Sequence, residues 1–282
     1  MDARIAWLNG EYVPLAEAKV SAQDRGFLFA DGIYEVTAVL DGRLVESPAH
    51  LSRLRRSAAA LDIALPIDGA EIEAVERELI ARNGLREGGI YLQLTRGAGE
   101  RDFLSEPDHP TLLLFTQARD VVANPAAESG VAVMTMPDIR WKRRDIKSVM
   151  LLAQVLAKRA AREAGAQEAW LVEEGYVTEG ASSTALIVTQ GGTLVTRPNS
   201  DAILPGCTRI GALAAAEKMG LPIAERLFTV EEALAAREAM LTSASNFVLP
   251  IVRIDGHPIG DGHPGPIARE LRRLYIEAAR AG

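Results

Sequence analysis

The chain has 282 residues, of which 48% are hydrophobic and 24% charged, values typical of a globular protein large enough for two domains. A formal net charge of -7 argues against a nucleic-acid partner. The single cysteine, Cys207, excludes a disulfide within the chain and favours a cytoplasmic location, and no apolar run approaches the ~20 residues needed to cross a membrane.

The first third of the chain is predicted to alternate strands, tight turns and helices. Asn9-Gly10 and Asp41-Gly42 each separate two short β segments, which is the pattern of a two-residue hairpin. Ser47 is expected to cap a helix that begins at Pro48, and a second helix is expected at about 69–82. The predicted strands are 5–8, 11–13, 33–40, 43–45, 90–95 and 111–115.

Residues 119–125 are predicted to link two domains, formed by residues 1–118 and 126–282. Short β segments and helices alternate irregularly after this linker, which indicates a mixed α+β fold rather than a regular βαβ array. The four histidines have no metal-ligand spacing, so we expect no metal site. The helices expected in the second domain are 149–164, 208–219, 230–236 and 265–280.

Lys147 is the first candidate for chemistry. It ends a cationic segment that contains Lys142, Arg143 and Arg144 and that precedes a predicted alanine-rich helix. Nearby positive charge favours the neutral form of an amine, which is the form that makes a Schiff base with an aldehyde. A solvated basic patch fits the same segment, so this pattern does not decide by itself.

Two later segments could hold other parts of a cofactor. Glu179 lies among small hydroxyl residues and could keep a pyridine nitrogen protonated, although an ordinary turn fits as well. Thr208 is expected to cap a helix after Gly206, where free N–H groups and the helix dipole favour an anion. Ser243 and Ala244 belong to a small polar segment that could line a pocket or form a turn.

Tyr34 and Arg53 also have two interpretations each. Tyr34 could pack on its sheet or direct its phenol into a pocket. Arg53 is one of three arginines on the first predicted helix and could be solvated or pair bidentately with a phosphate.

Seven motifs follow one another along the chain: Asp24-Arg25-Gly26, Asp31-Gly32-Ile33-Tyr34-Glu35-Val36, His50-Leu51-Ser52-Arg53-Leu54, Thr95-Arg96-Gly97, Asp145-Ile146-Lys147-Ser148, Thr178-Glu179-Gly180 and Gly206-Cys207-Thr208-Arg209. In this order they resemble the fold-type IV enzymes that depend on pyridoxal 5'-phosphate (PLP), most closely the D-amino-acid aminotransferases. The resemblance covers about residues 4–275. It implies a smaller N-terminal α/β domain and a larger C-terminal domain with a β-barrel-like core.

The resemblance also implies how the cofactor is held. Lys147 would form the internal aldimine with PLP and then move the proton between the substrate Cα and the cofactor. Glu179 would pair with the pyridinium. Ala244 replaces a usual threonine, so only its backbone would contribute. The expected phosphate-binding residues are Arg53, Cys207, Thr208, Ser243 and Ala244.

Substrate binding follows from the same resemblance. Tyr34 and Ser183 would line the pocket, and Arg101 matches a loop arginine that holds the substrate α-carboxylate. That loop comes from the neighbouring subunit in the family, so a homodimer is expected. Phe103 stands where better-known members have a histidine. A phenyl ring donates no hydrogen bond, so substrate binding is expected to weaken ten- to roughly a hundred-fold unless Arg96 or Arg101 compensates.

The resulting hypothesis is transamination between a D-amino acid and an α-keto acid, 2-oxoglutarate or pyruvate, in two half-reactions. The segment Asp31–Glu35 argues against a branched-chain L-amino-acid aminotransferase, and Arg101 argues against aminodeoxychorismate lyase. An (R)-selective amine transaminase stays open because of Phe103. A catalytically inactive binding protein of this fold is disfavoured, since Lys147 and Glu179 are both present.

Overall fold

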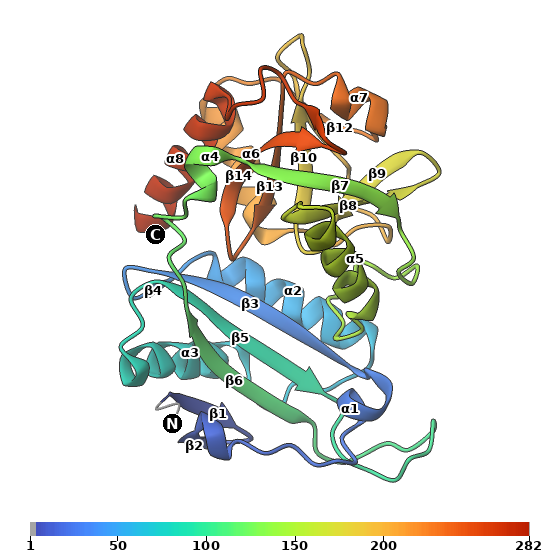
Figure 1. Ribbon diagram of the computed structural model, residues 1–282. Coiled ribbons are helices and arrows are strands. Elements are labelled where there is room, and N and C mark those ends of the chain that lie inside the picture. The colour runs from blue at the N-terminus through green and yellow to red at the C-terminus, as the bar shows by residue number, and fades with distance from the viewer. Residues whose placement is uncertain (1–3, 282) are drawn as a thin grey trace. The chain divides into compact units, whose positions relative to one another are not determined.

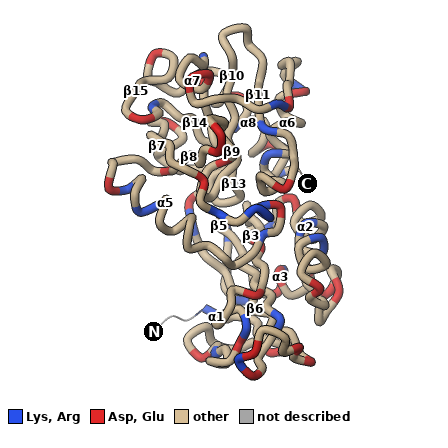
Figure 2. The backbone as a smooth tube through the Cα atoms, turned by 90° about the vertical axis from the view of Figure 1, so that its right-hand side faces the viewer, with Lys and Arg blue, Asp and Glu red and all other residues tan. Residues whose placement is uncertain are grey.

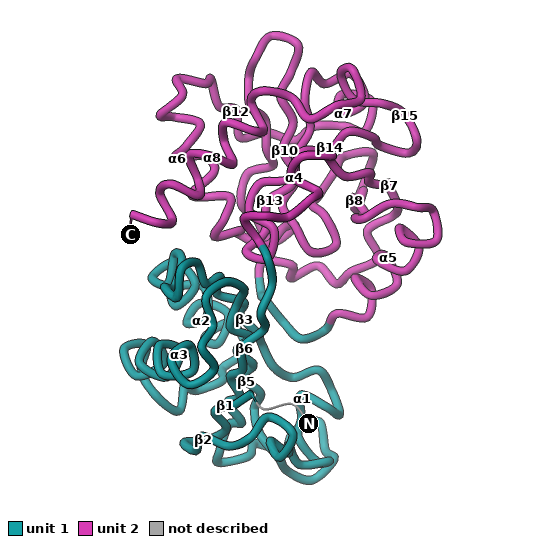
Figure 3. Tube along the Cα trace, turned by 60° about the vertical axis from the view of Figure 1, so that its left-hand side comes forward, with its two compact units in different colours: residues 1–120, 146–150 teal, residues 121–145, 151–282 magenta. Residues whose placement is uncertain are grey.

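The computed structural model describes residues 4–281 and divides into two compact units (Figures 1 and 3). Unit 1 comprises residues 1–120 and 146–150, and unit 2 comprises residues 121–145 and 151–282. The division after residue 120 falls inside the expected linker. Residues 146–150 cluster with unit 1, although they follow the linker in the sequence. Both units mix helices and strands, which confirms the predicted fold class.

Unit 1 is built on a six-stranded antiparallel sheet with the strand order β2-β1-β6-β5-β3-β4. Helices α2 and α3 pack against strands of this sheet (Figure 1). The elements of unit 1 are β1 (Ile5–Leu8), β2 (Glu11–Pro14), the 3-10 helix η1 (Leu15–Glu17), α1 (Arg25–Phe29), β3 (Gly32–Leu40), β4 (Arg43–Leu44), α2 (Ser47–Ala60), α3 (Gly69–Asn83), β5 (Gly88–Thr95) and β6 (Thr111–Ala118).

Local sequence signals explain the turns of unit 1 better than they explain its helix starts. Both predicted hairpins form, because Asn9-Gly10 and Asp41-Gly42 adopt the positive φ values that such turns need. The expected cap at Ser47 is wrong by one residue. Glu46 precedes α2, and the hydroxyl of Ser47 donates instead to Glu73 on α3, 3.0 Å away.

The short segment 146–150 runs beside the beginning of β3. Tyr34 donates its backbone N–H to the carbonyl oxygen of Lys147 at 2.9 Å, and Val149 donates to the carbonyl oxygen of Gly32 at 3.0 Å. These backbone bonds fix Lys147 next to Tyr34, so two of the predicted site residues meet within unit 1.

Unit 2 contains a nine-stranded mixed sheet with the order β12-β11-β10-β13-β14-β7-β8-β9, and β15 pairs with β14. Strand β9, at one end of this order, also contacts β10, so the sheet curls. The elements are α4 (Ala126–Ser129), β7 (Val131–Pro137), α5 (Leu152–Glu163), β8 (Glu168–Glu173), β9 (Tyr176–Gly180), β10 (Thr184–Val188), β11 (Leu194–Thr196), α6 (Cys207–Lys218), β12 (Ile223–Glu225), α7 (Val230–Leu234), β13 (Glu238–Ser243), β14 (Phe247–Ile254), β15 (His257–Pro258) and α8 (Pro266–Ala281).

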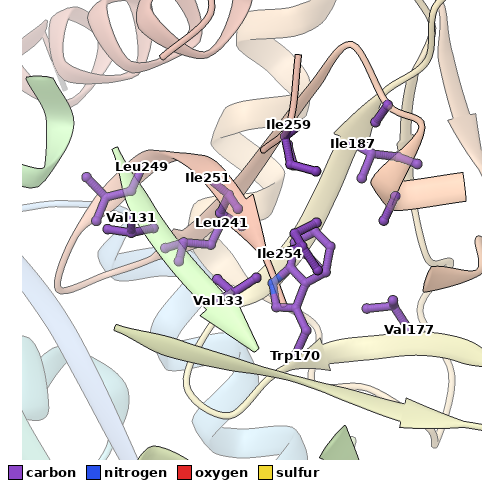
Figure 4. Packing of buried hydrophobic residues seen from close by; sticks show 14 of the residues in the cluster. Val131, Val133, Trp170, Val177, Ile187, Leu241, Leu249, Ile251, Ile254 and Ile259 are labelled. Atoms are coloured by element: carbon purple, nitrogen blue, oxygen red, sulfur yellow. The ribbon is translucent and has the colours of Figure 1, made fainter. Parts of the chain in front are cut away.

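The core of unit 2 is formed by apolar side chains from the curled sheet (Figure 4). Val133, Trp170 and Leu241 come from three different strands and are all buried. Trp170 contacts Phe228 edge to face, with ring centroids 6.0 Å apart. Burial of each large apolar side chain contributes about 1.5–3 kcal/mol, so this core fixes the strand ends and loops that carry the candidate site.

Charge is distributed over both units. Figure 2 shows basic and acidic residues interspersed along the chain in this view. Within residues 4–281, no helix is long and apolar enough to span a membrane.

Candidate active site

Lys147 lies over an aromatic side chain of unit 1. Its Nζ is 4.2 Å from the centroid of the Tyr34 ring, and its backbone N–H donates to the hydroxyl of Ser57 at 3.3 Å. The Tyr34 ring stacks on Tyr91 of β5, which in turn contacts Phe115 of β6. The amine is therefore held above a row of aromatic rings that crosses three adjacent strands.

The three cations that precede Lys147 in the sequence are each compensated by a carboxylate. Lys142 and Arg144 pair with Glu173, and Arg143 pairs with Asp145. The positive charge that precedes Lys147 in the sequence is therefore balanced by carboxylates. The interaction that the structure gives to the amine of Lys147 is the contact with Tyr34.

Arg53 belongs to a buried ionic cluster that includes Glu35, the residue after Tyr34. Its Nε and Nη2 each donate to one oxygen of Glu35 at 2.7 Å, and Nδ1 of His50 lies 2.8 Å from the same carboxylate. Burial alone would raise the pKa of Glu35, but Arg53 and His50 outweigh it and hold that pKa well below its ordinary value. Burial lowers the pKa of His50.

Sequence reasoning missed the partners in this cluster. Glu35 directly follows Tyr34, and His50 precedes Arg53 by three residues, the spacing of neighbours on one helix face. Two nitrogens of Arg53 are committed to Glu35, and phosphate binding by this arginine stays a prediction.

Arg101 and Phe103 lie in the loop between β5 and β6. The guanidinium carbon of Arg101 is 5.6 Å from the centroid of Phe29, and the Phe103 ring is 5.3 Å from the same centroid. Arg96 or Arg101 was expected to compensate for the missing histidine, and compensation by Arg96 stays a prediction. Its guanidinium pairs with Asp31 at 2.8 Å and donates to two carbonyl oxygens just after α2.

Glu179 is buried in unit 2 and is held from two directions. Nη1 of Arg140 donates to it at 2.6 Å, and the backbone N–H of Leu204 lies 3.1 and 3.2 Å from its two oxygens. Arg140 also donates to Asp138 at 2.7 Å. Neither Arg140 nor Asp138 was predicted from the sequence. The two residues are only two positions apart, and Arg140 lies 39 residues before Glu179, so no local spacing indicates the contact.

The beginning of α6 is shaped like an anion site. Gly206 caps the helix without a side chain, so the expected cap, Thr208, is wrong and lies inside the helix. A Cβ at position 206 would lie 2.6 Å from the hydroxyl oxygen of Thr184. Thr242 faces Thr184 across the β10–β13 ladder, and its buried hydroxyl has no hydrogen-bond partner within residues 4–281. Cys207 and Thr208 are buried beside this cap.

The other predicted residues of unit 2 have partners within the unit. Ser243 ends β13, and its hydroxyl accepts a hydrogen bond from Asn246 at 3.2 Å, across the turn that contains Ala244. Ser183 donates its hydroxyl to the buried carboxylate of Glu168 at 3.1 Å. Its role in substrate binding stays a prediction.

Comparison with known proteins identifies the family of this chain. Residues 32–254 match the family Amino-transferase class IV. The chain belongs to this family. It is 40% identical over 277 residues to D-alanine aminotransferase of Staphylococcus aureus (strain N315), covering 96% of this chain and 98% of that protein. It is 38% identical to D-alanine aminotransferase of Bacillus licheniformis, covering 94% and 93%. The structure of the branched-chain aminotransferase of Thermoproteus uzoniensis with norvaline has a TM-score of 0.89 at 25% identity, covering 99% and 95%.

This class IV aminotransferase is a PLP-dependent enzyme. Each unit by itself carries groups of the kinds that PLP needs. In unit 1 this group is the amine of Lys147. In unit 2 the groups are the carboxylate of Glu179, a helix start capped by Gly206 and the hydroxyl of Thr242, which has no hydrogen-bond partner within residues 4–281. When bound, PLP supplies the electron sink that stabilises a carbanion at the substrate Cα. Within residues 4–281, no group of three or more His, Cys, Asp or Glu side chains could hold a metal ion.

Proposed function

We propose that this enzyme transfers the amino group between a D-amino acid and an α-keto acid, with pyruvate or 2-oxoglutarate as acceptor. The observation that carries the proposal is the 40% identity, over 96% of the chain, to a protein named D-alanine aminotransferase. The segment Asp31–Glu35 supports the same assignment, because it resembles the D-specific branch of the fold-type IV enzymes.

In this proposal Lys147 is the catalytic acid and base. Its Nζ would hold PLP, and its free amine would move the proton at the substrate Cα. The backbone bond from Tyr34 fixes the main chain of Lys147, and the Tyr34 ring limits where Nζ can move. Such a restriction would favour proton transfer by holding the amine in a defined position.

The remaining cofactor contacts are assigned to groups that the fold already orients. Glu179 would pair with the ring nitrogen, as the resemblance to the fold-type IV enzymes implies, and the bonds from Arg140 and Leu204 orient its carboxylate. The helix start at α6 would receive the phosphate. The residues proposed to bind the phosphate are Arg53, Cys207, Thr208, Ser243 and Ala244.

Substrate recognition is assigned to Arg101 for the α-carboxylate, with Tyr34, Phe103 and Ser183 lining the pocket. We further propose a cytoplasmic homodimer in which the loop with Arg101 serves the neighbouring subunit. The two domains would be residues 1–118 and 126–282, joined by residues 119–125. Light scattering after size exclusion tests the dimer, since a monomeric active enzyme would contradict it.

A branched-chain L-amino-acid aminotransferase is the second candidate. It is favoured by the structural similarity to the Thermoproteus uzoniensis enzyme, but that similarity comes with only 25% identity. An (R)-selective amine transaminase is the third, because Phe103 removes a polar group from the loop that carries Arg101.

A substrate panel distinguishes these candidates. The holoenzyme is offered D-alanine, D-glutamate, L-leucine or (R)-1-phenylethylamine, each with 2-oxoglutarate, and the ketone or keto-acid product is measured. We expect turnover with D-alanine and D-glutamate. Turnover of L-leucine without D-alanine would contradict the proposal and support the second candidate.

Two lysine variants test the covalent assignment. Lys147→Ala should abolish turnover and lose the visible absorption of bound PLP on desalting. The matched control, Lys142→Ala, removes a lysine whose side chain is mostly exposed and should keep both. Retention of the visible band by Lys147→Ala after desalting would contradict the role of Lys147.

A further inference from the structure

The loop that carries Arg101 is anchored by one buried guanidinium. Arg25, at the beginning of α1, donates its Nε to Asp31 at 2.8 Å. Its two terminal nitrogens donate to the carbonyl oxygens of Asp102 at 2.6 Å and Phe103 at 3.2 Å. The guanidinium is a rigid planar fork, so the bond to Asp31 orients it and the other two bonds fix two consecutive loop residues directly after Arg101.

The ring of Phe29, the last residue of α1, joins this anchor to the side chains of the loop. The guanidinium carbon of Arg25 lies 4.8 Å from its centroid, and that of Arg101 lies 5.6 Å away. The ring of Phe103 completes the contacts, at a centroid distance of 5.3 Å and an interplanar angle of 41°. We call Arg25, Phe29, Arg101 and Phe103 the arginine–phenylalanine stack.

Arg101 is the member of this stack whose N–H donors remain available. The donors of Arg25 are used on Asp31 and on loop carbonyl oxygens, and those of Arg96 are used on Asp31 and on carbonyl oxygens after α2. Arg101 has no ion pair or hydrogen bond to any residue from 4 to 281, and its guanidinium contacts the Phe29 ring. Contact with a ring face restricts a guanidinium while leaving its in-plane donors free for a carboxylate.

We propose that Phe29 is a positioning residue that holds Arg101 for the substrate α-carboxylate, and that Phe103 orders the loop by packing on Phe29. The inference deepens the proposed amino-acid transamination and rests on it. Phe103 would then support the loop through an aromatic contact, in place of the histidine that better-known members of the family have at this position. The enzyme therefore keeps a preference for amines that carry a carboxylate over simple amines.

Three variants of the holoenzyme test the stack by its effect on carboxylate binding. We measure kcat and KM for D-alanine, and the inhibition constant of propionate, which has a carboxylate but no amine. Phe29→Leu removes the ring and should raise both KM and the inhibition constant roughly ten-fold, with kcat changed less than about two-fold. Phe29→Tyr keeps the ring face and should match the wild type. Phe27→Leu is the matched control, because Phe27 is on the same helix and 78% exposed.

Phe103→Leu gives a second test that does not depend on the folding of α1. Its side chain is 77% exposed, so the substitution should leave thermal unfolding unchanged while raising the inhibition constant in the same direction as Phe29→Leu. Unchanged propionate binding in both variants would overturn the proposal. A loss confined to kcat would overturn it as well.

A double-mutant cycle separates positioning from general damage. Arg101→Gln should weaken propionate binding on its own, and Phe29→Leu should have no further effect in that background. Equal effects of Phe29→Leu with and without Arg101 would overturn the proposal. Failure of the wild type to turn over D-alanine would instead refute the proposed function, because propionate binding to the holoenzyme can also be titrated spectroscopically and then reports on the stack without any turnover.

Discussion

Arg140 donates one N–H to Glu179 at 2.6 Å and others to Asp138, so a single buried guanidinium compensates two carboxylates. Burial alone would lower the pKa of Arg140, but the two carboxylates outweigh it and raise that pKa. Burial would likewise raise the pKa of Asp138, yet the bonds from Arg140 hold it below its ordinary value. The carboxylate of Glu179 is thereby oriented by the protein itself.

Arg140→Gln should destabilise the protein and reduce activity together. Removing Arg140 takes one positive charge away from two buried carboxylates, while Asp138 keeps its ion pair with Arg144 at 3.4 Å. Removal of one partner from a buried ion pair typically costs about 3–5 kcal/mol. Glu179 would also lose its fixed orientation, so turnover of D-alanine should fall sharply. Urea unfolding and steady-state kinetics measure the two effects.

Arg143→Gln is the matched control for this substitution. Arg143 is largely exposed and pairs with Asp145, so its removal should leave the urea midpoint and the turnover unchanged. If Arg140→Gln unfolded at the same urea concentration as Arg143→Gln, the buried network would have no special role in stability.

Gly206→Ala should weaken PLP binding. A Cβ at this position would lie 2.6 Å from the Thr184 hydroxyl and 3.3 Å from Cβ of Arg209, so the start of α6 or the neighbouring strand must shift. A shifted helix start presents its N–H groups less well to a phosphate. We expect the dissociation constant of PLP, measured by spectroscopic titration of the apoenzyme, to rise roughly ten-fold, about 1.4 kcal/mol.

Gly191→Ala provides the comparison. A Cβ there would meet only the Thr189 hydroxyl at 3.8 Å, an ordinary contact. PLP affinity should therefore match the wild type. An equal affinity in all three proteins would show that the cap of α6 does not contribute to cofactor binding.

The hairpins of unit 1 could be predicted because their cause is local. Asn9-Gly10 and Asp41-Gly42 accept positive φ values whatever surrounds them. Helix starts were less predictable, because tertiary partners compete for the capping group. Ser47 gives its hydroxyl to Glu73, 26 residues further along the chain on another helix, instead of capping α2.

The site shows the same division between local and distant causes. Lys147 and Tyr34 each carry a motif, but their contact depends on backbone bonds between segments that are far apart in the sequence. Arg25 and Arg140 were not assigned roles from the sequence. Arg25 binds the carbonyl oxygen of Asp102 and Arg140 binds Glu179, and these partners are too far away in the sequence for a motif to indicate the contacts. Ordered motifs therefore indicated the cofactor, whereas the ion pairs around the predicted site residues required the structure.

Glu76 makes the stability of unit 1 dependent on pH. Its side chain on α3 is 2% exposed; Oε1 accepts a bond from Thr37 at 3.1 Å, and Oε2 has no partner within residues 4–281. Burial outweighs the opposing hydrogen bond from Thr37 and, with smaller contributions from Glu73 and Glu35, raises the pKa of Glu76 to about 7. The ordinary value is 4.5.

The direction of the effect follows from this difference. Below pH 4.5 both the folded and unfolded chains carry the proton, so the contribution to stability is fully present. Between pH 4.5 and about 7 the unfolded chain loses the proton first, and the free energy of unfolding falls by up to about 3 kcal/mol. Glu76→Gln cannot ionise and should be more stable than the wild type at about pH 8, while the two should converge near pH 4.5.

Urea unfolding from about pH 4.5 to about pH 8 measures this difference. Glu78→Gln, an exposed substitution on the same helix, is the matched control and should follow the wild type at each pH. The pH dependence comes from the buried acid Glu76. Its ionisation creates a negative charge on a carboxylate whose Oε2 has no hydrogen-bond donor within the described residues. Parallel pH profiles for the wild type and Glu76→Gln would therefore show that Glu76 reaches water or a donor when it ionises.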